Sequence, residues 1–262
     1  MPMPATGKVD VMTTETVLTA DTGTPTGNAP ERLGFSGKLW NLFLDPRKTF
    51  DSVGDGHEWI VLWLIIAAIA LAGYYPIKDI VKTSQIEQVE KQLEGNPGVT
   101  PEQRQEIVDN MAENFENPVW LLLTPVFQLI AMLFVAAVLL FIANIILGGN
   151  TKFILMLNAY AWTGMLTILG TLVVVPLVMA KGSMDVSLGL GVLASEETGP
   201  FVKKVLTSFE LFGLWQVWLS SVAVSVLGKA PIGKSFATVF VAWFVWILAQ
   251  GGLATIGVNF GM

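Results

Sequence analysis

The sequence contains no cysteine and a single histidine, and only 14% of its 262 residues are charged. Without cysteine, the chain can form neither a disulfide nor a thiolate metal site. The histidine, His57, lies beside Glu58, and one such pair makes neither a zinc site nor an acid–base pair for catalysis. Soluble domains carry about 25% charged residues, so the low charge content argues against this class. We predict no catalytic residue, no cofactor and no metal ion.

Apolar residues, by contrast, make up 53% of the chain, and the mean hydropathy is +0.61. They gather in five runs, each near or above the roughly 20 residues needed to cross a hydrocarbon core. The runs are continuous, unlike the alternating segments of a transmembrane barrel. The sequence therefore predicts an all-α, polytopic membrane domain over residues 59–258. Its five spans are expected at about residues 59–80, 119–147, 153–180, 206–227 and 235–258.

Two different segments precede the first span. Residues 1–31 are rich in Thr, Pro, Gly and Asp, a composition that predicts a disordered polar tail. Residues 32–58 contain a short apolar stretch followed by Asp45 and Pro46, which suit the N-cap and first position of a second short helix. Phe50 and the valine three residues later share one face of that helix. Both helices are too short to span, so we expect amphipathic helices in the membrane surface; a soluble hairpin packed on the bundle is the alternative.

A polar segment, residues 82–117, separates the first two spans and predicts a helical hairpin. In its second helix, Thr100 suits the N-cap, Pro101 the first position, and Gln103 the remaining position of a capping box. The acidic excess of this segment and its flanks accounts for the net charge of −6. This acidic face is either a solvated surface or a binding surface for cations or a basic partner.

Glu210 precedes the fourth apolar run. An ionisable residue at membrane depth is costly and is by default a candidate functional site. If the span instead begins at Leu211, Glu210 lies at the interface, near Lys203 and Lys204. We then expect it to orient the fourth span through a polar contact at the membrane edge.

Asparagines and glycines mark further candidate positions. Asn144, Gly148 and Gly149 are expected to close the second span in a tight turn. Asn158 lies in the third span among glycines and threonines. Because small and hydroxyl-bearing residues bring transmembrane helices together, helix packing is the favoured role of Asn158, and the lining of a substrate path is the alternative.

Residues 228–235, with the sequence GKAPIGKS, match the phosphate-binding pattern GxxxxGK[ST]. That pattern binds nucleotides where it follows a buried strand and opens a helix. Here it follows a membrane-spanning run, which favours a simple turn between the fourth and fifth spans. We expect neither a nucleotide nor a nucleic acid as a partner.

Several segments together resemble bacterial members of the Yip family, named for Ypt/Rab-interacting proteins. Asp45–Phe50 is similar to the P-x-x-T-F sequence at the entry of the family's domain. Gly148–Phe153 resembles the family's glycine turn between the second and third spans. Phe209–Phe212 with Trp215 resembles its fourth span, in which an acidic residue, leucine and phenylalanine precede a tryptophan. Lys234–Ala237 then resembles the hairpin turn that follows.

The resemblance implies five membrane helices, a cytoplasmic N-terminus and an outside C-terminus. Lysines and arginines near the span ends divide evenly between the two sides, so charge alone does not orient the chain. Eukaryotic relatives bind prenylated Rab GTPases and act in vesicle traffic. We therefore expect a non-enzymatic membrane scaffold or adaptor in a bacterial cytoplasmic membrane. It would contact the lipid bilayer and a protein partner or a second copy of itself.

The alternative function is a small transporter or channel. In that case Glu210, Asn144, Asn158 and Gln250 would line a polar path through the bundle. No paired broken helices or inverted repeat are visible in the sequence, which favours the scaffold.

Overall fold

The computed structural model of the protein describes residues 33–94, 98–195 and 197–255. These residues form helices and connecting segments without a strand, apart from an isolated bridge between Gly189 and Glu210. Four helical stretches within them are long and apolar enough to cross a membrane. The prediction of an all-α, polytopic membrane protein is confirmed. The predicted tail, residues 1–31, lies outside the described residues.

The described chain begins with two short helices, α1 (Phe35–Leu44) and α2 (Pro46–Asp51). Helix α2 starts at Pro46, where the missing N–H of proline costs no hydrogen bond. Asp45 does not cap α2 with its side chain; its carboxylate instead pairs with Lys48 Nζ at 3.3 Å. The two helices pack on each other, and we call them together the cap.

The first span is α3, and it continues through a 3-10 turn into the first helix of the polar hairpin. The capping box predicted at the second hairpin helix is present: Thr100 Oγ1 accepts from the Gln103 N–H, and Gln103 Oε1 accepts from the Thr100 N–H. These bonds fix the start of that helix. The elements are α3 (Glu58–Tyr74), η1 (Tyr75–Ile77), α4 (Lys78–Glu94) and α5 (Pro101–Glu116).

The remaining spans differ in regularity. The second ends in a π-helical turn, and the third is divided into two helices at Met165. The predicted fourth span, 206–227, is also divided: its helix starts at Leu211 and has 17 residues, about 25 Å of rise. The elements are α6 (Pro118–Phe141), η2 (Ile142–Ile146), α7 (Phe153–Gly164), α8 (Leu166–Lys181), η3 (Leu190–Leu193), α9 (Pro200–Ser208), α10 (Leu211–Leu227) and α11 (Ile232–Thr255).

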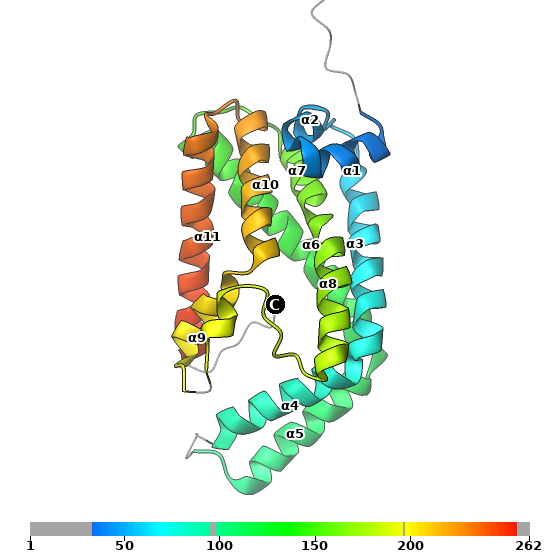
Figure 1. Cartoon of the computed structure of the whole chain (residues 1–262), viewed down its shortest axis with the longest axis vertical. Coiled ribbons are helices and arrows are strands. Elements are labelled where there is room, and N and C mark those ends of the chain that lie inside the picture. The colour runs from blue at the N-terminus through cyan, green and yellow to red at the C-terminus, as the bar shows by residue number, and fades with distance from the viewer. Residues whose placement is uncertain (1–32, 95–97, 196, 256–262) are drawn as a thin grey trace, which may run out of the picture. The chain divides into compact units, whose positions relative to one another are not determined.

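The cap shares a hydrophobic core with α3, α6, α7, α8 and α10, while Val239 of α11 belongs to a second buried cluster. Helix α7 contacts α3, α6 and α10, while α10 contacts α11 and the cap helix α2. Figure 1 shows the cap at the end of the bundle where α3 begins, and the α4–α5 hairpin at the end where α3 finishes. The core side chains that are at most 1% exposed include five large ones from four different parts of the chain. They are Leu42 and Phe50 of the cap, Leu62 of α3, Trp162 of α7 and Leu219 of α10.

The turn after η2 packs directly on the turn after α10. A Cβ atom on Gly149 would lie 2.8 Å from two backbone carbonyl oxygens, one of them that of Gly228. Gly148 adopts the left-handed region with a φ of 74°. Asn144 closes the turn, since its amide donates to the Thr151 carbonyl at 2.9 Å and accepts from the Thr151 N–H at 2.8 Å. The glycines and Asn144 therefore join two hairpin ends.

Candidate functional site

Polar and charged side chains gather beneath the cap, and we call this group the cap cluster. Its members come from both cap helices, from the first residue of α3 and from α7, so segments far apart in the sequence meet here. Polar groups buried between the cap and the spans need partners within the protein, because burial without a hydrogen bond costs free energy. The cap cluster consists of Lys38, Thr49, Glu58, Asn158 and Trp162.

Lys38 and Glu58 form an ion pair in which Lys38 Nζ lies 2.5 Å from Glu58 Oε1. The Lys38 side chain is 6% exposed and that of Glu58 is 36% exposed. The indole N–H of Trp162 donates to the second carboxylate oxygen, Glu58 Oε2, at 2.9 Å. Lys38 Nζ also lies 5.9 Å from the centre of the Trp162 ring, within reach of a cation–π contact. The buried ammonium thus has a carboxylate and an aromatic face as partners.

Asn158 fastens the loop between the cap and α3. Its side chain is fully buried, and its amide donates to the carbonyl oxygens of Gly54 at 2.9 Å and Gly56 at 2.7 Å. Its Oδ1 accepts the backbone N–H of Trp59 at 2.9 Å. Both N–H groups of the amide and its oxygen are therefore engaged with this loop.

The two cap helices are joined to each other and to α10. Thr49 Oγ1 of α2 donates to the carbonyl oxygen of Lys38 in α1 at 2.8 Å, and both residues are buried. The Phe43 ring of α1 meets the Trp215 ring of α10 edge-on, with 5.8 Å between their centres. Phe50, the neighbour of Thr49, fills the core from the same side. The cap is thus bound to the bundle by polar and aromatic contacts at once.

The opposite surface of the cap is exposed, apolar and basic. Trp40 and Leu44 are four residues apart on α1, hence on one face, and they are 69% and 67% exposed. Arg47 and Lys48 of α2 are exposed as well, and Lys48 is paired with the Asp45 carboxylate. We call these four residues the outer cap surface.

Glu210 lies apart from the cap cluster, directly before α10. Its backbone pairs with Gly189, and its carbonyl oxygen accepts the Leu214 N–H at 2.9 Å. The partly exposed side chain borders a hollow of about 300 Å³ together with Lys204 and Gln250. Partial burial raises the pKa of the Glu210 carboxyl above its usual range, an effect that the positive charge of Lys204 opposes.

The predicted site residues therefore fall into separate groups. Phe50 and Asn158 lie under the cap, with Trp215 at its edge. Glu210 and Phe212 lie at the start of α10, where the Phe212 ring packs next to the backbone of α8 at Gly170. The Asn144 turn is a third group. Neither Asn144 nor Asn158 lines the hollow at Glu210.

Sequence reasoning did not find the ionic part of the cap cluster. Lys38 is the one charged residue of α1 and lies one turn from the buried Leu42, so it is on the inward face. A lone charge on the inward face of an apolar helix needs a partner, so the position of Lys38 was the feature of the sequence that indicated a buried ion pair. Glu58 and Trp162 could not be identified as the partners from spacing, because they lie in two other helices.

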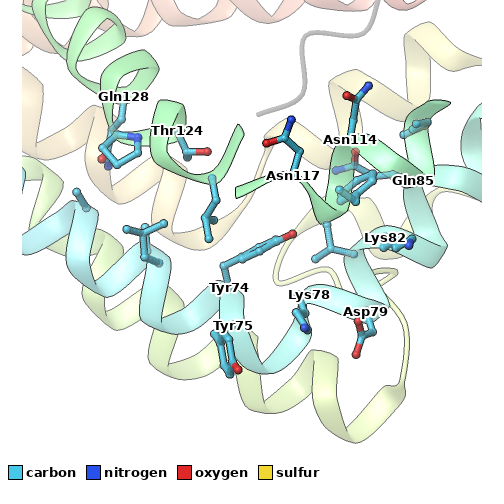
Figure 2. Close-up of a pocket in the computed structure, with 18 residues that line it drawn as sticks. Tyr74, Tyr75, Lys78, Asp79, Lys82, Gln85, Asn114, Asn117, Thr124 and Gln128 are labelled. Carbon is cyan, nitrogen blue, oxygen red and sulfur yellow. The ribbon is translucent and has the colours of Figure 1, made fainter. Parts of the chain in front are cut away.

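A larger cavity, of about 920 Å³, lies where α3 and α6 meet the α4–α5 hairpin. Figure 2 shows Thr124 and Gln128 towards one end of this region and Lys78, Asp79 and Lys82 towards the other. Ligand pockets usually measure about 300–1,000 Å³, so this cavity has the size of a binding site.

The Yip1 domain family model matches residues 40–254, from the exposed face of α1 to the last turn of α11. This chain belongs to the Yip1 domain family. The resemblance predicted from the short motifs is confirmed over most of the chain. None of the curated proteins and none of the solved structures matches it. The protein is thus a membrane protein of the Yip type, and the Yip1 family is not a family of enzymes.

Proposed function

We propose that this Yip1-domain protein is a non-enzymatic scaffold or adaptor of a bacterial cytoplasmic membrane, which acts through lipid and protein contacts of its cap. The N-terminus is cytoplasmic in this proposal and the C-terminus is outside, so the cap lies at the cytoplasmic face. The observation that carries the proposal is the two-sided character of the cap, which is fixed in the core on one side and apolar and basic on the other.

The inner side supports the proposal because a binding platform must hold its shape when a partner is attached. Three independent contacts hold the cap: the Lys38–Glu58 ion pair, the hydrogen bonds of Asn158 to the following loop, and the Phe43–Trp215 ring contact. A partner that binds the cap is therefore coupled to the membrane helices α3, α7 and α10.

The outer cap surface supports contacts with both lipids and proteins. Tryptophan favours the headgroup level of a bilayer, and each basic residue near an anionic membrane surface contributes about 1 kcal/mol. Exposed Trp40 and Arg47 are also of the residue types enriched at protein interfaces. The surface therefore fits a membrane-facing edge that also receives a protein partner.

The polar residues of the alternative transporter path have other partners. The amide of Asn158 is engaged with the backbone of the loop between the cap and α3. The amide of Asn144 is engaged with the backbone of Thr151 in the turn that follows its own span. Glu210 and Gln250 border a hollow that neither asparagine reaches. These placements favour the scaffold over a continuous polar path.

A paired experiment tests the proposal. A photo-crosslinking amino acid at Trp40 in the full chain, expressed in cells, should trap one defined protein in stoichiometric amount, and Trp40→Ser with Leu44→Ser should abolish its co-purification. The control is Val192→Ser with Leu193→Ser, which removes equally exposed apolar residues of η3 and should leave the partner bound. Reconstituted wild-type protein should move neither ions nor lipids across liposomes. Flux that is lost in Glu210→Gln, together with no partner at Trp40, would show that the proposal is wrong.

A further inference from the structure

The hollow of about 300 Å³ beside Glu210 has unused binding groups, and an inference about it stands independently of the proposed function. Three elements line it: α9, the chain at the start of α10, and the last turns of α11. Figure 1 shows these elements meeting at the side of the bundle away from the cap. The hollow is therefore separate from the cap cluster and from the outer cap surface.

Gln250 of α11 is buried without a hydrogen-bond partner. The residue is 8% exposed, and its side-chain amide makes no hydrogen bond within the part of the chain that the structure describes. Both polar atoms of the amide remain accessible, so the small exposed part of the residue includes this end of its side chain. Because buried polar groups are nearly always hydrogen-bonded, the amide of Gln250 indicates a partner that binds in the hollow it lines.

The hollow also contains two opposite charges that do not pair with each other. The Glu210 carboxylate and the Lys204 ammonium both line it, yet neither charged group forms an ion pair or a hydrogen bond with another described residue. Partial burial raises the pKa of the Glu210 carboxyl, and the charge of Lys204 offsets this only in part. A ligand with a cation for Glu210 and an anion for Lys204 would satisfy both groups, so a zwitterion fits the hollow.

The hydrogen-bond acceptors select the kind of cation. An ionised Glu210 carboxylate only accepts hydrogen bonds, and the amide oxygen of Gln250 accepts as well. A primary ammonium has N–H donors for both, whereas a quaternary ammonium has none. Trp246 lines the same hollow, but a tryptophan ring attracts either kind of cation. The two acceptors therefore favour a primary ammonium.

The position of the hollow along α11 indicates the anion. Gln250 lies about 27 Å along the helix from Ile232, close to the ~30 Å thickness of a hydrocarbon core. The turn before Ile232 carries the exposed Lys229 at the cap end of the bundle, so Gln250 lies at the depth of the opposite headgroups. Trp246 suits this depth, which tryptophan prefers. The zwitterions of this layer combine an amine with a phosphate.

We propose that this hollow binds an aminoethyl phosphate group. Its primary ammonium donates to the Glu210 carboxylate and to Gln250 Oε1, and its phosphate lies beside the Lys204 ammonium. The same group occurs as the headgroup of phosphatidylethanolamine and as free phosphoethanolamine.

The test uses the purified full chain, stripped of lipid in detergent, under native mass spectrometry. Wild type should bind one phosphatidylethanolamine in a saturable manner. Phosphatidylcholine with the same acyl chains should bind at least about tenfold more weakly, because its trimethylated amine cannot donate. Free phosphoethanolamine distinguishes the two sources: displacement of the lipid at similar concentrations would show that the group alone carries the affinity, and no displacement that the lipid is required. Binding of neither compound by wild type would overturn the proposal.

Single substitutions with matched controls test each contact. Gln250→Leu and Glu210→Gln should each weaken phosphatidylethanolamine binding by about tenfold, since each removes one hydrogen-bond partner of the ammonium or its charge. Lys204→Ala should weaken it by about fivefold. Gln216→Leu and Lys203→Ala make the same changes at nearby residues that do not line the hollow, and both should leave the affinity unchanged.

Three further results would overturn the proposal. The first is equal affinity for phosphatidylethanolamine and phosphatidylcholine, which would mean that no N–H group is recognised. The second is undiminished binding by Gln250→Leu, a variant that folds readily because it places an apolar side chain of similar size in a buried position. The third is an equal effect of Lys203→Ala and Lys204→Ala. Loss of the Trp40 partner affects none of these measurements, so the hollow and the cap are tested separately.

Discussion

Lys38 and Glu58 form an ion pair whose two members are buried to very different extents, 6% and 36% exposed. Removal of Glu58 therefore has a different consequence from removal of Lys38. Without the carboxylate, an ammonium stays in the core; without the ammonium, the carboxylate keeps the Trp162 indole and some access to water.

We accordingly expect Glu58→Gln to destabilise the protein by about 2–3 kcal/mol, somewhat less than is usual for a fully buried pair because Glu58 is partly exposed. Lys38→Met, which keeps the apolar stem, should cost less than about 1 kcal/mol. Chemical unfolding in micelles measures both. The double variant should resemble Lys38→Met, and equal losses in the two single variants would contradict this account.

Asn158→Ala should destabilise the protein by about 2–4 kcal/mol, since it leaves the Trp59 N–H and two loop carbonyls without partners. Asn144→Ala is the matched comparison and should cost about 1 kcal/mol, because water reaches its half-buried turn. Hydrogen exchange adds a local readout: the Trp59 amide should lose protection in Asn158→Ala and keep it in Asn144→Ala. Retained protection in both would show that the side chain does not fix this loop.

Gly149→Ala should lower the stability by more than about 2 kcal/mol, because its Cβ meets backbone atoms on two sides that cannot rotate away. Gly148→Ala should cost about 1 kcal/mol, since it meets no neighbouring atom but forces a left-handed residue. Gly233→Ala lies in α11 with open space around it and should be neutral or stabilising. Thermal unfolding of the three proteins should reproduce this order; a different order would mean that the two turns do not pack as described.

Glu210→Gln should make stability less dependent on pH. The folded protein raises the pKa of this carboxyl, so it favours the protonated form, and wild type loses stability as the pH rises from the ordinary value of 4.5 through the raised one. The variant should equal wild type at about pH 4 and be more stable at about pH 7, by less than about 1 kcal/mol because the side chain is partly exposed. Lys204→Met, in a chain that keeps Glu210, removes the opposing positive charge. It should enlarge the loss of stability as the pH rises. Thermal melting curves of both proteins across this pH range test the prediction. A wild type that is more stable than the variant at neutral pH would mean that folding does not raise the pKa of Glu210.

The helical class and the local helix starts were predictable because they depend on neighbouring residues. Continuous apolar runs require helices in a bilayer, and the Thr100–Gln103 capping box is encoded within four residues. Pro46 likewise started its helix where expected. The break before Leu211 was less visible, because the pairing of Gly189 with Glu210 interrupts a segment whose composition alone permits a longer helix.

The cap cluster was predictable only in fragments. Asn158 was expected to join helices, yet its partners are backbone groups of a loop 102 and 104 residues earlier. The periodicity of apolar residues cannot predict a contact between residues so far apart. The mutual recognition of Lys38 and Glu58 depends on how α1 folds back onto the start of α3. Such relations follow from tertiary packing, and a single sequence contains no spacing rule for them.

The contacts of Asn158 also set an order of events during synthesis. The cap leaves the ribosome before the spans, but the side chain that fixes its loop is made 104 residues after Gly54. At about 5–20 residues per second, this interval lasts about 5–20 s. During that time Lys38 lacks the Trp162 face, and Trp215, the partner of Phe43, comes later still. The cap helices are thus translated before the spans and are among the last elements to reach their final positions.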